Sequence, residues 1–251
     1  MLKASLIGFY NTRESDPWEI IKKISGWGYK ALEHGGFLLK GDVNENVKKL
    51  ADLDFKVLGI SSDIDGLKNN FNKIVDDAGS IGVKNIICYW SDAQSYGEAL
   101  DIAGKLEEAG GNLSKAGLNL CYHNHEHEFK KSFNGTSFFD LLMAHTSNLY
   151  LDLDCGWATM GVGVENMPAL LERLKDRIKL VHFKDFYDLN YRESFTALGT
   201  GKVDIQGLLK EVDKHGFAEY ITVEQDVVRN LNTDDTVLLS YLTLKESGLV
   251  E

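Results

Sequence analysis

Histidine and carboxylate side chains stand at the ends of short apolar runs in this sequence, where an α/β chain leaves a buried strand. The clearest example is the block His-Asn-His-Glu-His-Glu at residues 123–128. Polar groups at inward-facing strand ends are costly to remove from water unless they are paired or bind something. Imidazole and carboxylate together form the ligand set of a catalytic divalent ion such as Mn, Co, Zn or Fe. We therefore expect a metal site, and its candidate ligands are His123, Asp154, His182 and Glu224.

The fold has to bring these strand ends together, and the pattern of the chain indicates how. Short apolar runs alternate with longer amphipathic stretches, which is typical of parallel strands joined by helical crossovers. The predicted strands are residues 5–10, 31–34, 56–62, 85–90, 118–125, 149–154, 179–183 and 220–225. The predicted helices are residues 17–27, 43–53, 67–81, 97–116, 137–145, 167–177, 205–215 and 234–246.

Eight strand–helix units in 251 residues match the size of a (β/α)8 TIM barrel. An open doubly wound sheet is the alternative, but no G-x-G-x-x-G motif follows the first predicted strand. No Pro-rich, Ser-rich or charge-dense linker interrupts the sequence, so we expect one α/β barrel domain over residues 1–251. Catalytic groups of such barrels lie at the C-terminal ends of the strands. Strands five to eight are neighbours, so one ligand from each would converge on a point.

Each candidate ligand also has a structural explanation. The histidines of the block could lie in a polar loop, Asp154 could cap a helix, and His182 could be a hydrogen-bonded core histidine. Glu224 could form a salt bridge. Because side chains alternate along a strand, Asp152 could face the same way one layer deeper. The same alternation places His125 beside the first histidine of its block, as a ligand or a substrate contact.

Other residues at this face are candidates for catalysis or substrate binding. Glu33 and His34 end the second predicted strand, and Glu33 could be the partner of a barrel Lys or Arg. Lys184 could bind a substrate oxygen or form a salt bridge with Asp185. Two tryptophans at this face could wall a sugar or simply pack. The candidate substrate-binding residues are Trp90, Trp157 and His34.

The composition of the chain limits the classes of partner that we expect. The 38 acidic residues outnumber the 27 Lys and Arg residues, which gives a formal net charge of −11. Phosphates reward a basic face, so we expect neither a nucleic acid nor a membrane as partner. No apolar run approaches the length of a membrane-spanning helix, and we expect no signal peptide at the first residues. The three widely spaced cysteines fit reduced thiols, so we expect a cytoplasmic protein.

At these residues the sequence resembles the sugar phosphate isomerase/epimerase family with the xylose isomerase-like TIM barrel. That family also includes endonuclease IV-like proteins, inosose dehydratases and ketose 3-epimerases. The resemblance covers essentially the whole chain, and the Tyr-His-Asn-His block with its trailing Glu-Phe marks a subgroup. It is carried by residues 31–33, 122–129, 153–157, 181–185, 198–204 and 223–225.

The resemblance implies one divalent ion, Mn, Co, Zn, Mg or Fe, at the ends of strands five to eight. The usual ligands there are Glu, Asp, His and Glu. The positions that match are Asp154, His182 and Glu224. Strand five departs from the pattern, because His123 stands where Glu is usual. In the ketose epimerases the two Glu ligands act as acid/base groups on opposite faces of the substrate, so another group must take part here. The candidates are Glu33, His125 and Lys184.

The implied chemistry is proton abstraction next to a carbonyl, with the metal stabilising the enediolate. We expect a divalent-metal-dependent sugar or keto-sugar isomerase/epimerase with a small carbohydrate substrate, and a homo-oligomer is left open. The alternative, kept open by the missing strand-five Glu, is a lyase or dehydratase acting on a keto-sugar or keto-inositol. The net charge of −11 argues against DNA repair. The three matching ligand positions argue against a non-catalytic carbohydrate-binding barrel.

Overall fold

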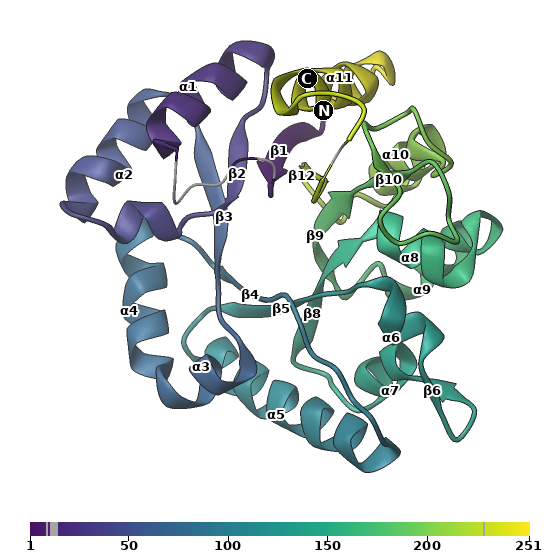
Figure 1. Ribbon diagram of the computed structural model, residues 1–251. Helices are drawn as coiled ribbons and strands as arrows, with labels where there is room; N and C mark the ends of the chain where they lie inside the picture. The colour runs from purple at the N-terminus through teal and green to yellow at the C-terminus, as the bar shows by residue number, and fades with distance from the viewer. Residues whose placement is uncertain (9, 11–14, 228) are drawn as a thin grey trace.

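The computed structural model describes residues 1–8, 10, 15–227 and 229–251. Within them, eight parallel strands close into a barrel, and helices form a ring around it (Figure 1). In order around the barrel the strands are β1 Lys3–Ile7, β2 Ala31–His34, β3 Lys56–Ser61, β4 Asn85–Cys88, β5 Asn119–His123, β8 Leu149–Asp154, β9 Ile178–Phe183 and β12 Tyr220–Glu224. This architecture confirms the predicted (β/α)8 barrel. Residue 9, in the first predicted strand, lies outside the described residues.

Most helices of the outer ring begin at a capping side chain; α4 and α9 do not. Asp16 accepts a hydrogen bond from the Trp18 N–H, and Pro17 takes the first helical position of α1. Asp42 and Ser95 cap their helices in the same way. The ring consists of α1 Pro17–Trp27, α2 Val43–Asp52, α4 Phe71–Ile81, α5 Tyr96–Lys115, α7 Phe138–Ala144, α9 Met167–Leu174, α10 Ile205–His215 and α11 Thr233–Glu246.

Short elements near the strand ends are absent from the sequence prediction. They are α6 Glu126–Lys130, α8 Cys155–Val162, the hairpin of β6 Ser132–Phe133 with β7 Thr136–Ser137, and the hairpin of β10 Asp185–Phe186 with β11 Phe195–Thr196. The predicted helix 67–81 is two helices, α3 Ile64–Asn69 and α4, which meet at Asn70. α8 has no amphipathic period because its first six residues are all buried. β4 and β5 each end two residues earlier than predicted.

The inward-facing side chains change from apolar to polar along the strands. Near the N-terminal ends they form an apolar layer made of Ala31, Leu58, Ile87, Cys121, Leu180 and Tyr220. Alternate residues of a strand share a face. The inner face therefore continues, two or four residues later on these strands, with Glu33, His123, His182 and Glu224. The polar groups thus lie on an apolar floor inside the barrel.

The segment between β9 and α10 is long, and Asp185 organises it. Its carboxylate accepts hydrogen bonds at 2.8–3.0 Å from the backbone N–H groups of Phe186, Gly199, Gly201 and Val203. A Cβ at Gly201 would lie 2.2 Å from Asp185 Oδ1, so this position requires glycine. Of the two alternatives for Lys184, the salt bridge with Asp185 is wrong, because Asp185 binds backbone groups instead. The carboxylate fixes the β10–β11 hairpin beside the C-terminal end of the barrel.

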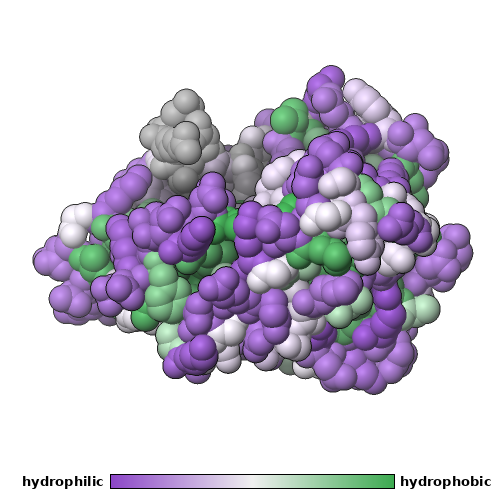
Figure 2. Space-filling model, turned by 90° about the horizontal axis from the view of Figure 1, so that it is seen from below, coloured by the Kyte–Doolittle hydropathy of each residue, from purple (hydrophilic) through white to green (hydrophobic). Residues whose placement is uncertain are grey.

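The surface shown in Figure 2 is covered mainly by hydrophilic residues, with hydrophobic ones in small separate patches. This polar exterior carries part of the acidic excess. Among the described residues, none of the helices combines the length and the apolar character that crossing a membrane would need.

One carboxylate ties the start of β8 to α5. Glu107 accepts hydrogen bonds at 2.7–2.8 Å from the backbone N–H groups and the side chains of Ser147 and Asn148. Burial alone would raise the pKa of Glu107, but these hydrogen bonds outweigh it and lower the pKa to about 2. The interaction matters for the site because β8 carries Asp152 and Asp154.

We expect Glu107→Gln to lower the free energy of unfolding at pH 7 by about 1–3 kcal/mol, because hydrogen bonds to a charged group are lost. The folded-state pKa lies below the unfolded value of about 4.3, so the stabilisation is present above that pH and is lost as the pH falls toward about 2. Urea unfolding curves should therefore converge for wild type and variant over that window. Glu108→Gln, at an exposed neighbour, should unfold like wild type. Equal stability of Glu107→Gln and wild type at pH 7 would contradict this account.

Candidate active site

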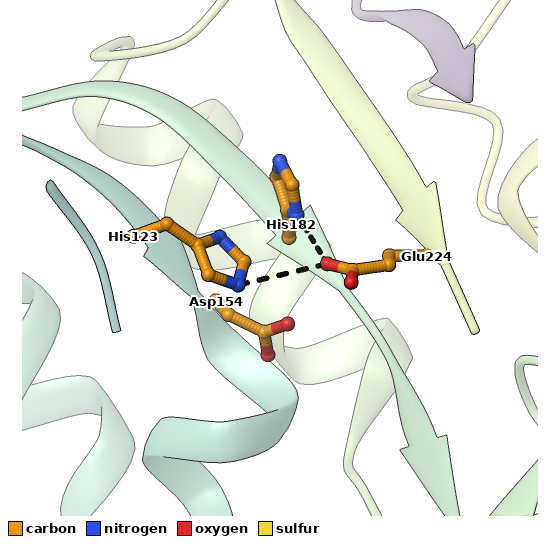
Figure 3. A group of neighbouring side chains, drawn as sticks. All are labelled: His123, Asp154, His182 and Glu224. Carbon is orange, nitrogen blue, oxygen red and sulfur yellow. Dashed lines mark hydrogen bonds and ion pairs between the residues drawn. The ribbon is translucent and has the colours of Figure 1, made fainter. Parts of the chain in front are cut away.

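Four predicted ligands from four adjacent strands converge at the C-terminal end of the barrel (Figure 3). Each offers one donor atom, and these atoms lie within 4.8 Å of one another. His182 Nδ1 is 2.6 Å from Glu224 Oε2, and His123 Nε2 is 3.7 Å from the same oxygen. Asp154 completes the group. We call His123, Asp154, His182 and Glu224 the four-residue cluster.

The four-residue cluster is buried on the side of the barrel interior and open on the side of the cavity that His125 lines. His123, Asp154 and His182 are buried, whereas the Glu224 side chain is 15% exposed. Burial favours the neutral form of Glu224, but the Lys184 ammonium and both imidazoles outweigh it and hold its pKa well below the usual range. Burial raises the pKa of Asp154 to about 6, against the opposing effect of Lys184. Glu224 is therefore ionised at neutral pH.

The donor set fits a divalent ion. One oxygen of Asp154, Oδ1, accepts a hydrogen bond from Trp157 N–H at 2.7 Å and so caps α8. The other, Oδ2, is buried without a hydrogen-bond partner. An unpartnered buried carboxylate oxygen beside two imidazoles and a second carboxylate is the environment that divalent metals satisfy. Both explanations of Asp154, helix cap and ligand, are thus compatible with its position.

Asn124 fixes the end of β5 against the end of β8. Its side-chain amide donates to the Asp154 carbonyl oxygen at 3.1 Å, and its side-chain oxygen accepts from the Asp154 N–H at 3.0 Å. These two hydrogen bonds hold His123 and Asp154 at a constant separation.

Glu33 lies behind His182 rather than at the substrate side. It is fully buried, its Oε2 is 2.5 Å from His182 Nε2, and its Oε1 accepts a hydrogen bond from Tyr89 Oη at 2.7 Å. Burial, with the negative charge of Asp152, raises its pKa. Tyr89 and His182, not a Lys or Arg, are its partners. This geometry fits a supporting role better than the expected acid/base role.

Lys184 is a buried cation beside the four-residue cluster. Its Nζ lies 3.2 Å from Glu224 Oε1, 3.1 Å from Asp226 Oδ2 and 3.9 Å from Asp154 Oδ2. Burial alone would lower the pKa of Lys184, but these carboxylates raise it, so the side chain stays cationic at neutral pH. The sequence does not reveal the Lys184–Asp226 contact, because the two residues are 42 positions apart.

His125 connects the four-residue cluster with a cavity. Its ring centroid lies 5.0 Å from that of His123 and 4.8 Å from that of Trp90. Burial, reinforced by His123 and Lys184, lowers the pKa of His125 to about 3, so the ring is neutral at pH 7. The cavity has a volume of about 540 Å³ and is lined by His125, Arg192, Glu193, Phe195, Asp226, Val227 and Arg229.

The substrate-binding candidates occupy different environments. Trp90 is 48% exposed at the rim, whereas Trp157 is buried beneath Lys184 and Arg192, 4.6 and 5.0 Å from its ring centroid. A sugar could reach the Trp157 ring only after Arg192 moves. His34 lies 2.8 Å from Ser61 Oγ and lines a second cavity of about 230 Å³. Sequence reasoning misses Arg192, because no pattern marks this hairpin residue as a neighbour of both tryptophans.

His125, His127 and Glu128 also come close together. Glu128 accepts hydrogen bonds from Tyr122 Oη at 2.7 Å and from the His125 N–H at 2.8 Å. Its carboxylate oxygens are thus engaged in holding the turn after β5, which explains this group structurally.

Comparison with known proteins identifies relatives of this chain and solved structures with the same fold. The inosose dehydratase of Serratia proteamaculans (strain 568) is 28% identical over 162 residues, 55% of this chain and 50% of that protein. The chain spans about half the length of the curated relatives it matches. A sugar phosphate isomerase/epimerase from Parabacteroides distasonis has the same fold, with a TM-score of 0.82 and 19% identity over 100% of this chain and 98% of that one. The IolI protein, solved with a bound zinc atom, gives a TM-score of 0.74 and 14% identity over 98% of each chain. The sequence profile of the xylose isomerase-like TIM barrel family matches residues 21–238, and this chain belongs to that family.

Proposed function

We propose that this protein is a divalent-metal-dependent dehydratase that acts on a keto-sugar or keto-cyclitol. It would remove a proton next to the carbonyl and expel a neighbouring hydroxyl group as water. The observation that carries the proposal is the asymmetry of the site: the ionised Glu224 on β12 faces the imidazole of His123 at the end of β5, and the His125 ring, at the start of α6, lies beside that imidazole. The name of the Serratia relative, and the zinc in the IolI structure, support the reaction class and the ion.

The four-residue cluster would hold the ion. A divalent ion bound there supplies Lewis-acid stabilisation of the negative charge that develops on the substrate carbonyl oxygen. Asn124 and the α8 cap keep the protein donors in place. The apolar floor beneath them limits water to the cavity side.

Glu224 would act as the general base. Its carboxylate is ionised, partly exposed and held between His182 and Lys184. It takes the proton from the carbon next to the carbonyl, and the resulting carboxylic acid gives that proton to the departing hydroxyl. One C–H and one C–O bond break, a carbon–carbon double bond forms, and one water leaves. A single carboxylate therefore suffices for this reaction.

Lys184 and His125 would orient the substrate. The Lys184 ammonium donates hydrogen bonds to a substrate oxygen whose negative charge grows during the reaction. His125 is a poor proton donor at pH 7, because its pKa of about 3 leaves the ring neutral. Epimerisation between two acid/base groups on opposite substrate faces would need such a donor opposite Glu224. The geometry therefore favours elimination over epimerisation between two acid/base groups.

A second candidate function is aldose–ketose isomerisation. A single carboxylate can also carry a proton between neighbouring carbons on one face of a substrate. The name of the Parabacteroides structure favours this candidate.

We expect the purified protein to bind about one divalent ion per chain, and His182→Ala to lose it because one donor of the four-residue cluster is removed. Elemental analysis after incubation with Mn²⁺, Co²⁺ or Zn²⁺ and gel filtration measures this. His34→Ala, at an exposed histidine outside the four-residue cluster, is the control and should retain the ion. A wild-type protein that retains none of these ions would exclude the proposal.

The reaction class can be read by NMR in D2O with the ion-loaded protein and a panel of ketoses, 3-keto-sugars and keto-inositols. Dehydration should give a product that has lost one water and gained a carbon–carbon double bond. Deuterium at the original carbonyl carbon, with the hydroxyl count unchanged, would identify an isomerase instead, and deuterium at a neighbouring carbon with the carbonyl retained would identify an epimerase. Loss of water from none of the panel, with such exchange present, would contradict the dehydratase.

Lys184→Met should lower kcat by about 10²–10³-fold while the ion content stays near one per chain, because a donor to developing charge is lost. Steady-state kinetics on the substrate found above, with elemental analysis, tests this. Lys202→Met changes an exposed lysine on the same segment and should leave kcat unchanged. A Lys184→Met enzyme with wild-type kcat would remove Lys184 from the mechanism.

A further inference from the structure

One further carboxylate, that of Asp152, lies directly under both imidazoles of the four-residue cluster. Asp152 is on β8, two residues before Asp154, and its side chain is completely buried. Its Oδ2 is 3.4 Å from His123 Nδ1 and 3.1 Å from His182 Nε2. His123 and Asp152 are also partners in the β5–β8 register. The residue thus belongs to the layer below the proposed ligands.

We propose that Asp152 is the positioning carboxylate of His123. It holds the Nδ1 hydrogen of the His123 ring on its own side and so directs Nε2 toward the ion. This inference rests on the proposed metal site. Asp152 contacts no substrate, and its role is exerted through His123.

The contacts that Glu33 and Asp152 make with the two imidazoles support this assignment. Glu33 already takes the Nε2 side of His182 at 2.5 Å, and one N–H makes one strong hydrogen bond. Asp152 is therefore left for His123. Among the described residues, neither Asp152 oxygen has a hydrogen-bond partner, and the His123 and His182 imidazoles, 3.4 and 3.1 Å from Oδ2, are near enough to compensate its buried charge.

The same arrangement fixes which nitrogen of each ring is the donor atom. A carboxylate behind a ring holds a hydrogen on the near nitrogen, so the far nitrogen is the one that binds an ion. The far nitrogens are His123 Nε2 and His182 Nδ1, and both face Glu224 Oε2. Each imidazole thus has a buried carboxylate behind it and the four-residue cluster in front of it. Such support from behind typically strengthens metal binding about 10–100-fold.

The charge of Asp152 also determines which side chain is suitable at position 123. A neutral imidazole lies favourably over a buried carboxylate, whereas a carboxylate in its place would face a like charge in a low-dielectric site. His123 and Asp152 should therefore be energetically coupled.

We expect Asp152→Asn, which is nearly isosteric, to weaken Zn²⁺ and Mn²⁺ binding about 10–100-fold relative to wild type. Competition with a chelating dye measures the dissociation constants, and thermal unfolding checks that the variant is folded. Asp176→Asn, at an exposed aspartate, is the matched control and should bind like wild type. A change below threefold in Asp152→Asn would overturn the proposal.

A double-variant cycle separates positioning from general destabilisation. His123→Glu should weaken binding strongly, and His123→Glu with Asp152→Asn should recover at least tenfold of that loss because the like charge is gone. His123→Glu with Glu33→Gln should show no recovery, since Glu33 supports His182. Absence of recovery in the first pair would refute the role of Asp152 even if Asp152→Asn alone does not fold. A wild-type protein without affinity for either ion would instead refute the metal site itself.

Discussion

His182 makes the contacts on which the site depends. One imidazole touches Glu33 and Asp152 with its Nε2 and Glu224 with its Nδ1, and all three carboxylates are withdrawn from most of the solvent. Buried carboxylates repel one another, so they can share this space only if positive charge or N–H groups lie between them. Burial opposes the charged form of His182, yet Asp152 and Glu33 raise its pKa well above the usual value. The ring thus links a lower pair of carboxylates with an upper, reactive one.

The barrel explains why such a group of charges can exist. Strands that run parallel bring their C-terminal ends to one rim, and alternation places every second side chain inside. In this chain the inner face is apolar up to Cys121 and Leu180 and polar from the next inward residue on. Segments beyond the strand ends then complete the site. Asp185 holds the hairpin that carries Arg192, and α8 begins on Asp154.

Much of this could be predicted from the sequence because it follows from periodicity. The strands that end at His123, Asp154, His182 and Glu224 are neighbours in the barrel, as the order of the predicted units indicates. Other features depend on distances between residues far apart in the chain. Periodicity places Glu33 on the inner face but does not say that it lies behind His182. The sequence offers the adjacent Asp185 as one possible partner of Lys184, whereas in the folded chain Asp226 Oδ2 lies 3.1 Å from Lys184 Nζ. Periodicity also misses α8, whose burial on all sides leaves no polar face.

Asp154 has two roles, and they connect the start of α8 with the four-residue cluster. Its Oδ1 caps α8 by accepting a hydrogen bond from Trp157 N–H, while the same carboxylate belongs to the four-residue cluster. Gly156, in the first turn, lies so close to the Lys184 backbone that a Cβ there would approach the carbonyl oxygen to 2.5 Å. α8 is therefore tied at its first turn to both β8 and β9. A movement of the Asp154 carboxylate toward the barrel axis therefore also acts on the first turn of α8. The local opening equilibrium of α8, as seen by amide exchange, is thereby linked to occupancy of the site.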